Sequence, residues 1–190
     1  QDLLVPQVLV DNPTMGDGVA LFHSSHNNIV DVPASSDLFT QTTIAAARVA
    51  LRRQKPVGAT ENPDIVENGE PIGLMPYAAL VPPELGEAAW VYFNSASQAG
   101  QSNPQIKNPH MSLLNRGGVM ELDRLTSSTV WFMTADPQDV EFISYHFLDN
   151  NDAPRIDVAE SFTSLSYKTR VWIPFGTSAK DFRGAVKIFV

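Results

Sequence analysis

The chain has 190 residues and a mass of 20.8 kDa, enough for one domain, or one domain with a small second lobe, around a real core. Its net charge of -8 argues against a broad phosphate-binding surface, which needs clustered Lys and Arg. The absence of cysteine excludes disulfides, thiolate metal sites and cysteine nucleophiles. No apolar run approaches the roughly 20 residues of a membrane-spanning helix, so we expect no membrane partner.

The first 13 residues are mostly apolar and are interrupted by Pro6. Proline permits a helix only after it or a kink through it. We therefore interpret this segment as the end of a longer element, with more of the protein expected before residue 1.

A helix is predicted after the capping cluster at residues 35–37, running to Lys55 before Pro56 and Gly58 stop it. Its apolar stripe consists of Leu38, Ile44, Ala45, Val49 and Leu51. Residues 57–73 show no periodic pattern of apolar residues, which predicts a surface loop or insertion.

Arg52, Arg53 and Lys55 form the only basic cluster in the sequence. At the end of a predicted helix such charges complement the helix dipole. We favour this interpretation over nucleic-acid contact, because three charges neutralise few phosphates.

The short apolar run 74–81 predicts a buried strand that leads into a second helix. Pro82 and Pro83 precede Glu84 and Glu87, and proline at the first helical position with acids in the first turn starts a helix well.

From residue 118 onward the apolar residues recur with a period of two, which is typical of strands. Strands are predicted over 130–134, 140–145 and 167–175. One face of the last strand carries Tyr167, Thr169, Val171, Ile173 and Phe175. Helices come first and strands later, which predicts an α+β domain with mostly antiparallel pairing.

His23 and His26 are three residues apart and could face one cation. A zinc site needs three or four ligands, and the other two histidines, His110 and His146, stand alone in the sequence. We therefore expect no metal site, and interpret the pair as ring nitrogens that bond backbone carbonyls in a turn and fix the course of the loop.

Ser24, His23 and Asp31 could be assembled on paper into a catalytic triad. Triads are recognised by geometry, and such residues often crowd together in a loop by chance. We predict no catalytic residues and no cofactor. Large apolar groups on both faces of a strand, as around Trp131 and Trp172, indicate that one face meets another subunit. The predicted subunit-interface residues are Trp131, Trp172 and Arg183.

Four landmarks lie in order along the sequence. They are residues 17–28 (Asp17-Gly18 to His26-Asn27-Asn28), 80–85 (Leu-Val-Pro-Pro-Glu-Leu), 131–137 (Trp-Phe-Met-Thr-Ala-Asp-Pro), and Phe175-Gly176 followed by Asp181-Phe182-Arg183-Gly184. Together they resemble the major head proteins of Mu-like phages. Asn27 stands where the family usually has Gly, and Asn also tolerates the left-handed backbone region. The matching motif residues are Asp17, Gly18, Phe22, His23, His26, Asn28, Pro82, Pro83, Asp181 and Gly184.

The resemblance implies a Hong Kong 97-type capsid fold, in which a mixed or antiparallel sheet with flanking helices forms an axial-type domain. Residues 1–35 would be the end of a spine helix and a remnant of the peripheral domain. Residues 36–125 would form the axial-type domain, and residues 126–190 would complete it and return to the peripheral domain. An N-terminal arm, a hairpin loop and most of the spine helix would precede residue 1, so the chain alone is expected to be a monomer or small oligomer.

The implied function is that of a structural major capsid subunit of a tailed phage or prophage, and not of an enzyme. It would self-assemble through pentamers and hexamers into an icosahedral shell that encloses double-stranded DNA without sequence-specific binding. Assembly is expected in the bacterial host cytoplasm, with the protein ending in the virion capsid, and scaffold, maturation protease and portal as further partners. The alternatives are an encapsulin-like compartment shell protein and, less favoured, a metal-dependent hydrolase using His23 and His26.

Overall fold

The computed structural model of the chain describes residues 4–33, 37–56, 70–97, 106–114, 117–160, 163 and 166–190. The helices are α1 (Leu4–Asp11), α2 (Gln41–Arg52) and α3 (Pro83–Asn94), with short 3-10 turns η1 (Ser24–His26), η3 (Leu148–Asn150) and η4 (Phe182–Gly184). The strands are β1 (Ile29–Asp31), β2 (Pro76–Val81), β3 (Gly118–Glu121), β4 (Val130–Ala135), β5 (Ile143–Phe147), β6 (Arg155–Glu160), β7 (Tyr167–Trp172), β8 (Phe175–Ala179) and β9 (Ala185–Phe189).

Helix α1 includes Pro6 in its first turn instead of starting after it. This is tolerated because the first four N–H groups of a helix have no intrahelical acceptor, so the missing proline N–H removes no bond. The helix ends at Asn12, which has a positive φ of 46° and donates its backbone N–H to the Val8 carbonyl.

Helix α2 confirms the helix predicted before Lys55, but its N-cap is Thr40 and not the cluster at 35–37. The Thr40 hydroxyl accepts from the Thr43 backbone N–H at 3.1 Å, and the Thr43 hydroxyl accepts in return from the Thr40 N–H at 2.9 Å. This reciprocal capping box fixes the start of the helix. The predicted loop at 57–73 lies, up to residue 69, outside the described residues.

The predicted strand and helix around the two prolines are confirmed by β2 and α3. Pro82 is the N-cap and Pro83 the first helical residue, where its fixed φ suits the helix. Both family-motif prolines therefore set the turn between a buried strand and the helix that follows it.

Five strands form one mixed sheet in the order β1-β9-β4-β2-β3. The central pairs β2–β4 and β4–β9 are antiparallel, while β1–β9 and β2–β3 at the edges are parallel. With the antiparallel pairs β5–β8 and β6–β7, the expected α+β class and mostly antiparallel pairing are confirmed among the described residues.

The sheet separates two apolar layers, which alternate along β4. Trp131 and Met133 face the layer that contains α2 and α3, and Phe132 faces the layer that contains α1. This alternation follows from the two-residue period of a strand. Within its layer α2 lies over the β1 and β9 side of the sheet, and α3 over the β2 and β3 side.

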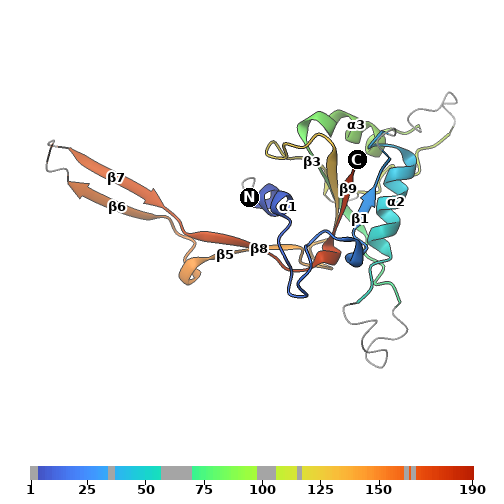
Figure 1. The fold of residues 1–190 in the computed structure, drawn as a ribbon. Coiled ribbons are helices and arrows are strands. Elements are labelled where there is room, and N and C mark those ends of the chain that lie inside the picture. Colours follow the sequence, from blue (N-terminus) through green and yellow to red (C-terminus); the bar gives the residue numbers. More distant parts are fainter. Residues whose placement is uncertain are drawn as a thin grey trace.

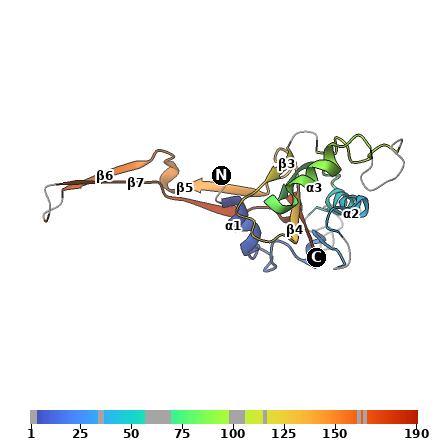
Figure 2. The same cartoon turned by 90° about the horizontal axis from the view of Figure 1, so that it is seen from above.

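Strands β5 to β8 form a long two-stranded ribbon that projects from this body (Figure 1). The inner half pairs β5 with β8 and the outer half pairs β6 with β7. Figure 2 shows the same projection from a perpendicular direction, with α1 lying beside the inner half. In the described part of the chain, no helix is long and apolar enough to cross a membrane.

The five-stranded sheet takes strands from all three predicted segments, 1–35, 36–125 and 126–190. The division into axial-type and peripheral parts stays a prediction.

Candidate assembly surfaces

A buried histidine fastens the loop between α1 and β1. The Nε2 atom of His26 lies 2.7 Å from an Asp17 carboxylate oxygen, and its Nδ1 lies 3.1 Å from the Leu21 carbonyl oxygen. Both ring nitrogens therefore lie within hydrogen-bond distance of an acceptor oxygen. The ring also stacks on Phe182 with 3.9 Å between centroids. The loop is thereby tied to the segment that precedes β9.

Asn28 makes the second link between the same two segments and is fully buried. Its side-chain amide donates to the carbonyl oxygens of Leu21, at 2.7 Å, and Phe182, at 3.1 Å. Its side-chain oxygen accepts the His23 backbone N–H at 3.1 Å. Asn27 beside it has a φ of 51°, the left-handed conformation that makes Asn an adequate replacement for Gly.

The remaining motif residues of this loop also act on its structure. Gly18 has a φ of 80°, which favours glycine, and Phe22 is buried against Phe132 with 5.2 Å between ring centroids. Hydrogen bonds from the Val19 backbone N–H and from His26 hold the pKa of Asp17 below its usual value. The residues of the 17–28 motif therefore hold this loop in one conformation.

The metal hypothesis for His23 and His26 finds little support in this geometry. The His23 Nδ1 atom is engaged by Ser25, whose hydroxyl lies 2.8 Å away and whose backbone N–H it accepts at 3.2 Å. The ring centroids of the two histidines are 6.4 Å apart. Within the described ranges, no group of three or more His, Cys, Asp or Glu residues could hold a metal ion.

The other two histidines have separate hydrogen-bond partners. His110 is buried, which lowers its pKa, and its Nε2 atom lies 3.3 Å from the Gln41 carbonyl oxygen. His146 lies on β5, with its Nε2 atom 3.0 Å from the Ser144 hydroxyl.

The motif residues near the C-terminus form a second rigid turn. Arg183 and Asp181 make an ion pair in which Nε lies 2.9 Å and 3.0 Å from the two carboxylate oxygens. Partial burial raises the pKa of Asp181, but the hydrogen bonds from Arg183 outweigh it, so the pKa of this carboxyl is lowered. Gly184 lies so close to Phe142 that an added Cβ would be 2.7 Å from the Phe142 Cβ.

The interface prediction for Trp131 is wrong. This residue has no exposed surface, because its ring stacks on Phe39 at 4.7 Å and meets the edge of Phe93 at 6.4 Å. Trp172 is partly exposed on the ribbon, where its indole N–H donates to Asp157 at 2.8 Å. A role of Trp172 or of the partly buried Arg183 in subunit contacts stays a prediction.

The outer half of the ribbon carries exposed apolar residues on one face. Directly paired residues share a face, and Ile156 pairs with Val171 while Val158 pairs with Thr169. Ile156, Val158 and Val171 are 65%, 63% and 63% exposed, and Tyr167 at the outer end is 75% exposed. We call these four residues the apolar ribbon face.

The opposite face of the outer half is mostly polar, and its side chains interact with one another. Asp157 accepts hydrogen bonds from Arg170, at 2.6 Å, and from the Trp172 indole. The guanidinium groups of Arg155 and Arg170 lie 5.2 Å and 5.8 Å from the centre of the Trp172 ring. The contrast between the two faces indicates that the apolar ribbon face, and not the polar face, is suited to burial against another surface.

A groove of about 600 Å³ lies where the inner half of the ribbon meets the body. Most of its lining is apolar, and it extends from α1 across the sheet to the ribbon; the lining residues are Val5, Leu80, Met120, Leu122, Ile143, Tyr145, Phe147, Ile173, Phe175 and Thr177. The alternation of residues 167–175 is visible in the sequence, but their position on a projecting arm is not, because pairing partners and exposure are tertiary properties.

Comparison with known proteins gives a family for the chain. A family model described as "Phage capsid protein" matches residues 2–188, while no curated protein matches. Among solved structures, a chain of the "Satellite phage P4 procapsid including size determination (Sid) protein" is similar over 94% of this chain and 45% of that chain, with 11% identity and a TM-score of 0.42. The present chain thus spans less than half the length of that one. With the family model covering nearly the whole sequence, the chain belongs to the phage capsid proteins, a family of structural proteins and not of enzymes.

Proposed function

We propose that the chain is the shell-forming part of a major capsid protein of the Hong Kong 97 type, in its Mu-like branch, and that the apolar ribbon face binds neighbouring copies. The family match over residues 2–188 supports the capsid role. The four motifs support the finer assignment: residues of three of them form the loop and turns described above, and the motif at 131–137 lies mostly on the buried central strand β4.

The observation that carries this proposal is the exposure of the apolar ribbon face. A two-stranded ribbon is at best marginally stable in water without packing on one face. Full burial of one Val or Ile side chain contributes roughly 1.5–3 kcal/mol. Since capsid proteins function as many identical copies, another copy is the partner that such a repeated contact requires.

The proposed shell is built from pentamers and hexamers and encloses double-stranded DNA in the virion. The net charge of -8 fits this role, because a wall without a broad basic surface does not bind the packed polymer tightly. Scaffold, maturation protease and portal are the further partners we propose, with assembly in the bacterial host cytoplasm.

The test compares two neighbouring substitutions, Val158→Asp and Ala159→Asp, in the intact gene product. Both residues are exposed on β6, but they face opposite sides of the ribbon, and Ala159 pairs with Lys168 on the polar side. Particles are counted by electron microscopy and sedimentation, with circular dichroism as the folding control.

We expect Val158→Asp to abolish or strongly reduce particle formation and Ala159→Asp to leave it near the unsubstituted level. Equal particle yields from both variants would remove the apolar ribbon face from the assembly contacts. An intact gene product that folds but never forms particles would contradict the shell function itself.

A further inference from the structure

The two flanks of the sheet carry opposite charges. Beside the β3 edge lie the exposed carboxyl groups of Glu84, Glu87, Glu121 and Asp123, which we call the acidic flank. On the β1 and β9 side lie Arg48 and Arg52 of α2 and its C-cap residue Arg53, which we call the basic flank. Arg124 reduces the charge of the acidic flank but leaves it negative in sum.

The acidic flank is built by close contact between α3 and the edge strand. A Cβ added to Gly86 would lie 2.2 Å from the Glu121 carboxylate, so this side chain lies directly over the helix. Glu84 and Glu87 are the next charged residues on either side of Gly86, and both are exposed. The glycine thus allows the carboxyl group of β3 to approach those of α3.

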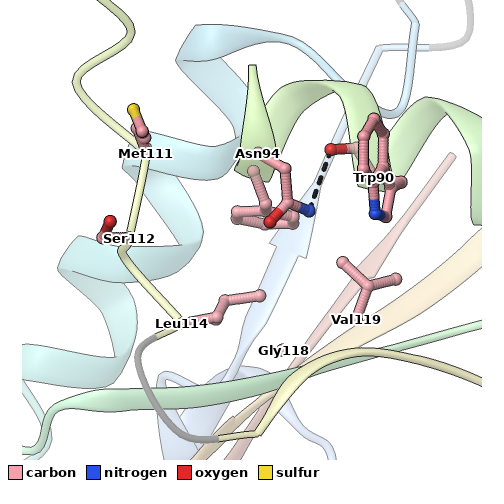
Figure 3. A pocket seen from close by; sticks show the side chains of 8 residues that line it. Trp90, Asn94, Met111, Ser112, Leu114, Gly118 and Val119 are labelled. Carbon is pink, nitrogen blue, oxygen red and sulfur yellow. Dashed lines mark hydrogen bonds between the residues drawn. The ribbon is translucent and has the colours of Figure 1, made fainter. Parts of the chain in front are cut away.

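A pocket of about 370 Å³ lies between α3 and the start of β3 (Figure 3), and its lining residue Trp90 follows Glu87 by three residues, which puts the two on neighbouring positions of the helix surface. Trp90 of α3 and Val119 of β3 line it, and Met111 and Ser112 enter from the connecting loop. Trp90 is 62% exposed, an unusual position for so large an apolar side chain. The acidic flank therefore combines negative charge with an open, mainly polar hollow and the exposed apolar side chain of Trp90.

The basic flank has the opposite charge to the acidic flank and also exposes an apolar side chain. Val49, predicted to lie in the apolar stripe of this helix, is instead 46% exposed and lines a surface depression with Arg48, Arg52 and Arg53. Arginines in the last turn also favour the helix dipole, which accounts for their position but not for the exposed valine among them.

We propose that the acidic flank of one copy binds the basic flank of the next, with Val49 of one copy packed at the Trp90 pocket of the other. Binding of either flank to itself would place like charges together, which disfavours a symmetric pair. A contact between two different surfaces is head-to-tail, and repeated copies close into a ring when the rotation fits. This inference rests on the proposed shell function and names surfaces that would join copies within a ring.

The test uses the absence of cysteine from the chain, which leaves introduced thiols as the only thiols. We compare the double variant Arg52→Cys/Glu87→Cys with each single variant, using a short bis-maleimide cross-linker on the 190-residue protein. The double variant can link head to tail without limit, whereas a single variant can link at most two copies. Circular dichroism verifies that all three are folded.

We expect a ladder extending beyond the dimer from the double variant, and little dimer from either single variant. Adding Glu84→Lys to the double variant should slow cross-linking about fivefold, and adding Arg53→Glu as well should restore part of the rate, because exposed ion pairs are worth about 0.2–1 kcal/mol each. High salt should slow the reaction of the double variant through screening.

A folded double variant that cross-links no further than its single variants would overturn the proposed contact. So would efficient dimer formation by Glu87→Cys alone, which would show that the acidic flank meets itself. Particles of the intact gene product without this ladder would leave the shell function standing and refute only the flank contact. A cross-linked ladder from the double variant, together with an intact gene product that forms no particles, would support the flank contact and contradict the shell function.

Discussion

His26 and Asp17 are joined by a hydrogen bond of 2.7 Å between the Nε2 atom and the carboxylate, although the histidine is buried and the aspartate is partly exposed. The other ring nitrogen is directed at the Leu21 carbonyl oxygen and the ring face is covered by Phe182. The pair therefore connects the surface of the loop to the segment before β9, more than 150 residues later in the sequence.

Replacing Asp17 by Asn should destabilise the protein at neutral pH and much less in acid. The Val19 N–H and His26 lower the pKa of Asp17, so its carboxylate adds stability above the ordinary pKa of an aspartate, about 3.9, and this stability is lost as the pH falls through the folded-state pKa. Urea unfolding of both proteins at neutral and acidic pH measures the difference.

Asp152, which is exposed on the ribbon, provides the matched control, since Asp152→Asn should change the free energy of unfolding little at either pH. A stability difference between Asp17→Asn and the unsubstituted protein that stays constant down to about pH 2, well below the ordinary aspartate pKa, would contradict the role of the carboxylate charge.

Local signals in the sequence predict the main elements of the body. The proline pair at 82–83 and the alternation at 130–134 specify backbone geometry through neighbouring residues alone, and both predictions are confirmed. The interpretation of His23 and His26 as bonding backbone carbonyls in a turn agrees with the position of His26 beside the Leu21 carbonyl oxygen. It does not describe His23, whose Nδ1 atom interacts with the hydroxyl and backbone N–H of Ser25.

Properties that depend on distant partners could not be predicted in the same way. Alternation shows that Trp131 faces one side of a strand, but not that Phe39 and Phe93 cover that side. The acidic flank likewise depends on the contact between Gly86 and Glu121, residues that no local pattern relates.

Replacing Trp131 by Ala should reduce the free energy of unfolding by about 3–5 kcal/mol, because it leaves a large cavity in the core. Trp131→Phe should cost less, since the indole nitrogen has no hydrogen-bond partner among the described residues and only volume is lost. Urea denaturation followed by circular dichroism measures both. An Ala variant of normal stability that fails only in assembly would restore the interface role.

Replacing Gly184 by Ala should cost about 1–3 kcal/mol through overpacking. The new methyl group would lie 2.7 Å from the Phe142 Cβ and 3.2 Å from its Cα, and the backbone atom cannot rotate away. Gly16→Ala is the matched control, because no atom lies within 4 Å of the place its new methyl group would take, and no loss of stability is expected. Equal thermal midpoints for the two variants would show that the turn before β9 can shift to accommodate the new methyl group without loss of stability.

The outer half of the ribbon should exchange its amide hydrogens much faster than the sheet in the isolated chain. Its hydrogen bonds join only β6 and β7, both largely exposed, whereas β4 is buried between β2 and β9. Local opening there requires far less free energy than opening of the core, so we expect exchange about 100-fold faster or more. Hydrogen exchange with mass spectrometry measures both regions, first in the free chain and then in assembled particles. In particles, burial of Ile156, Val158 and Val171 should slow exchange in β6 and β7 towards the rate of β4, and unchanged exchange there would place the subunit contacts elsewhere.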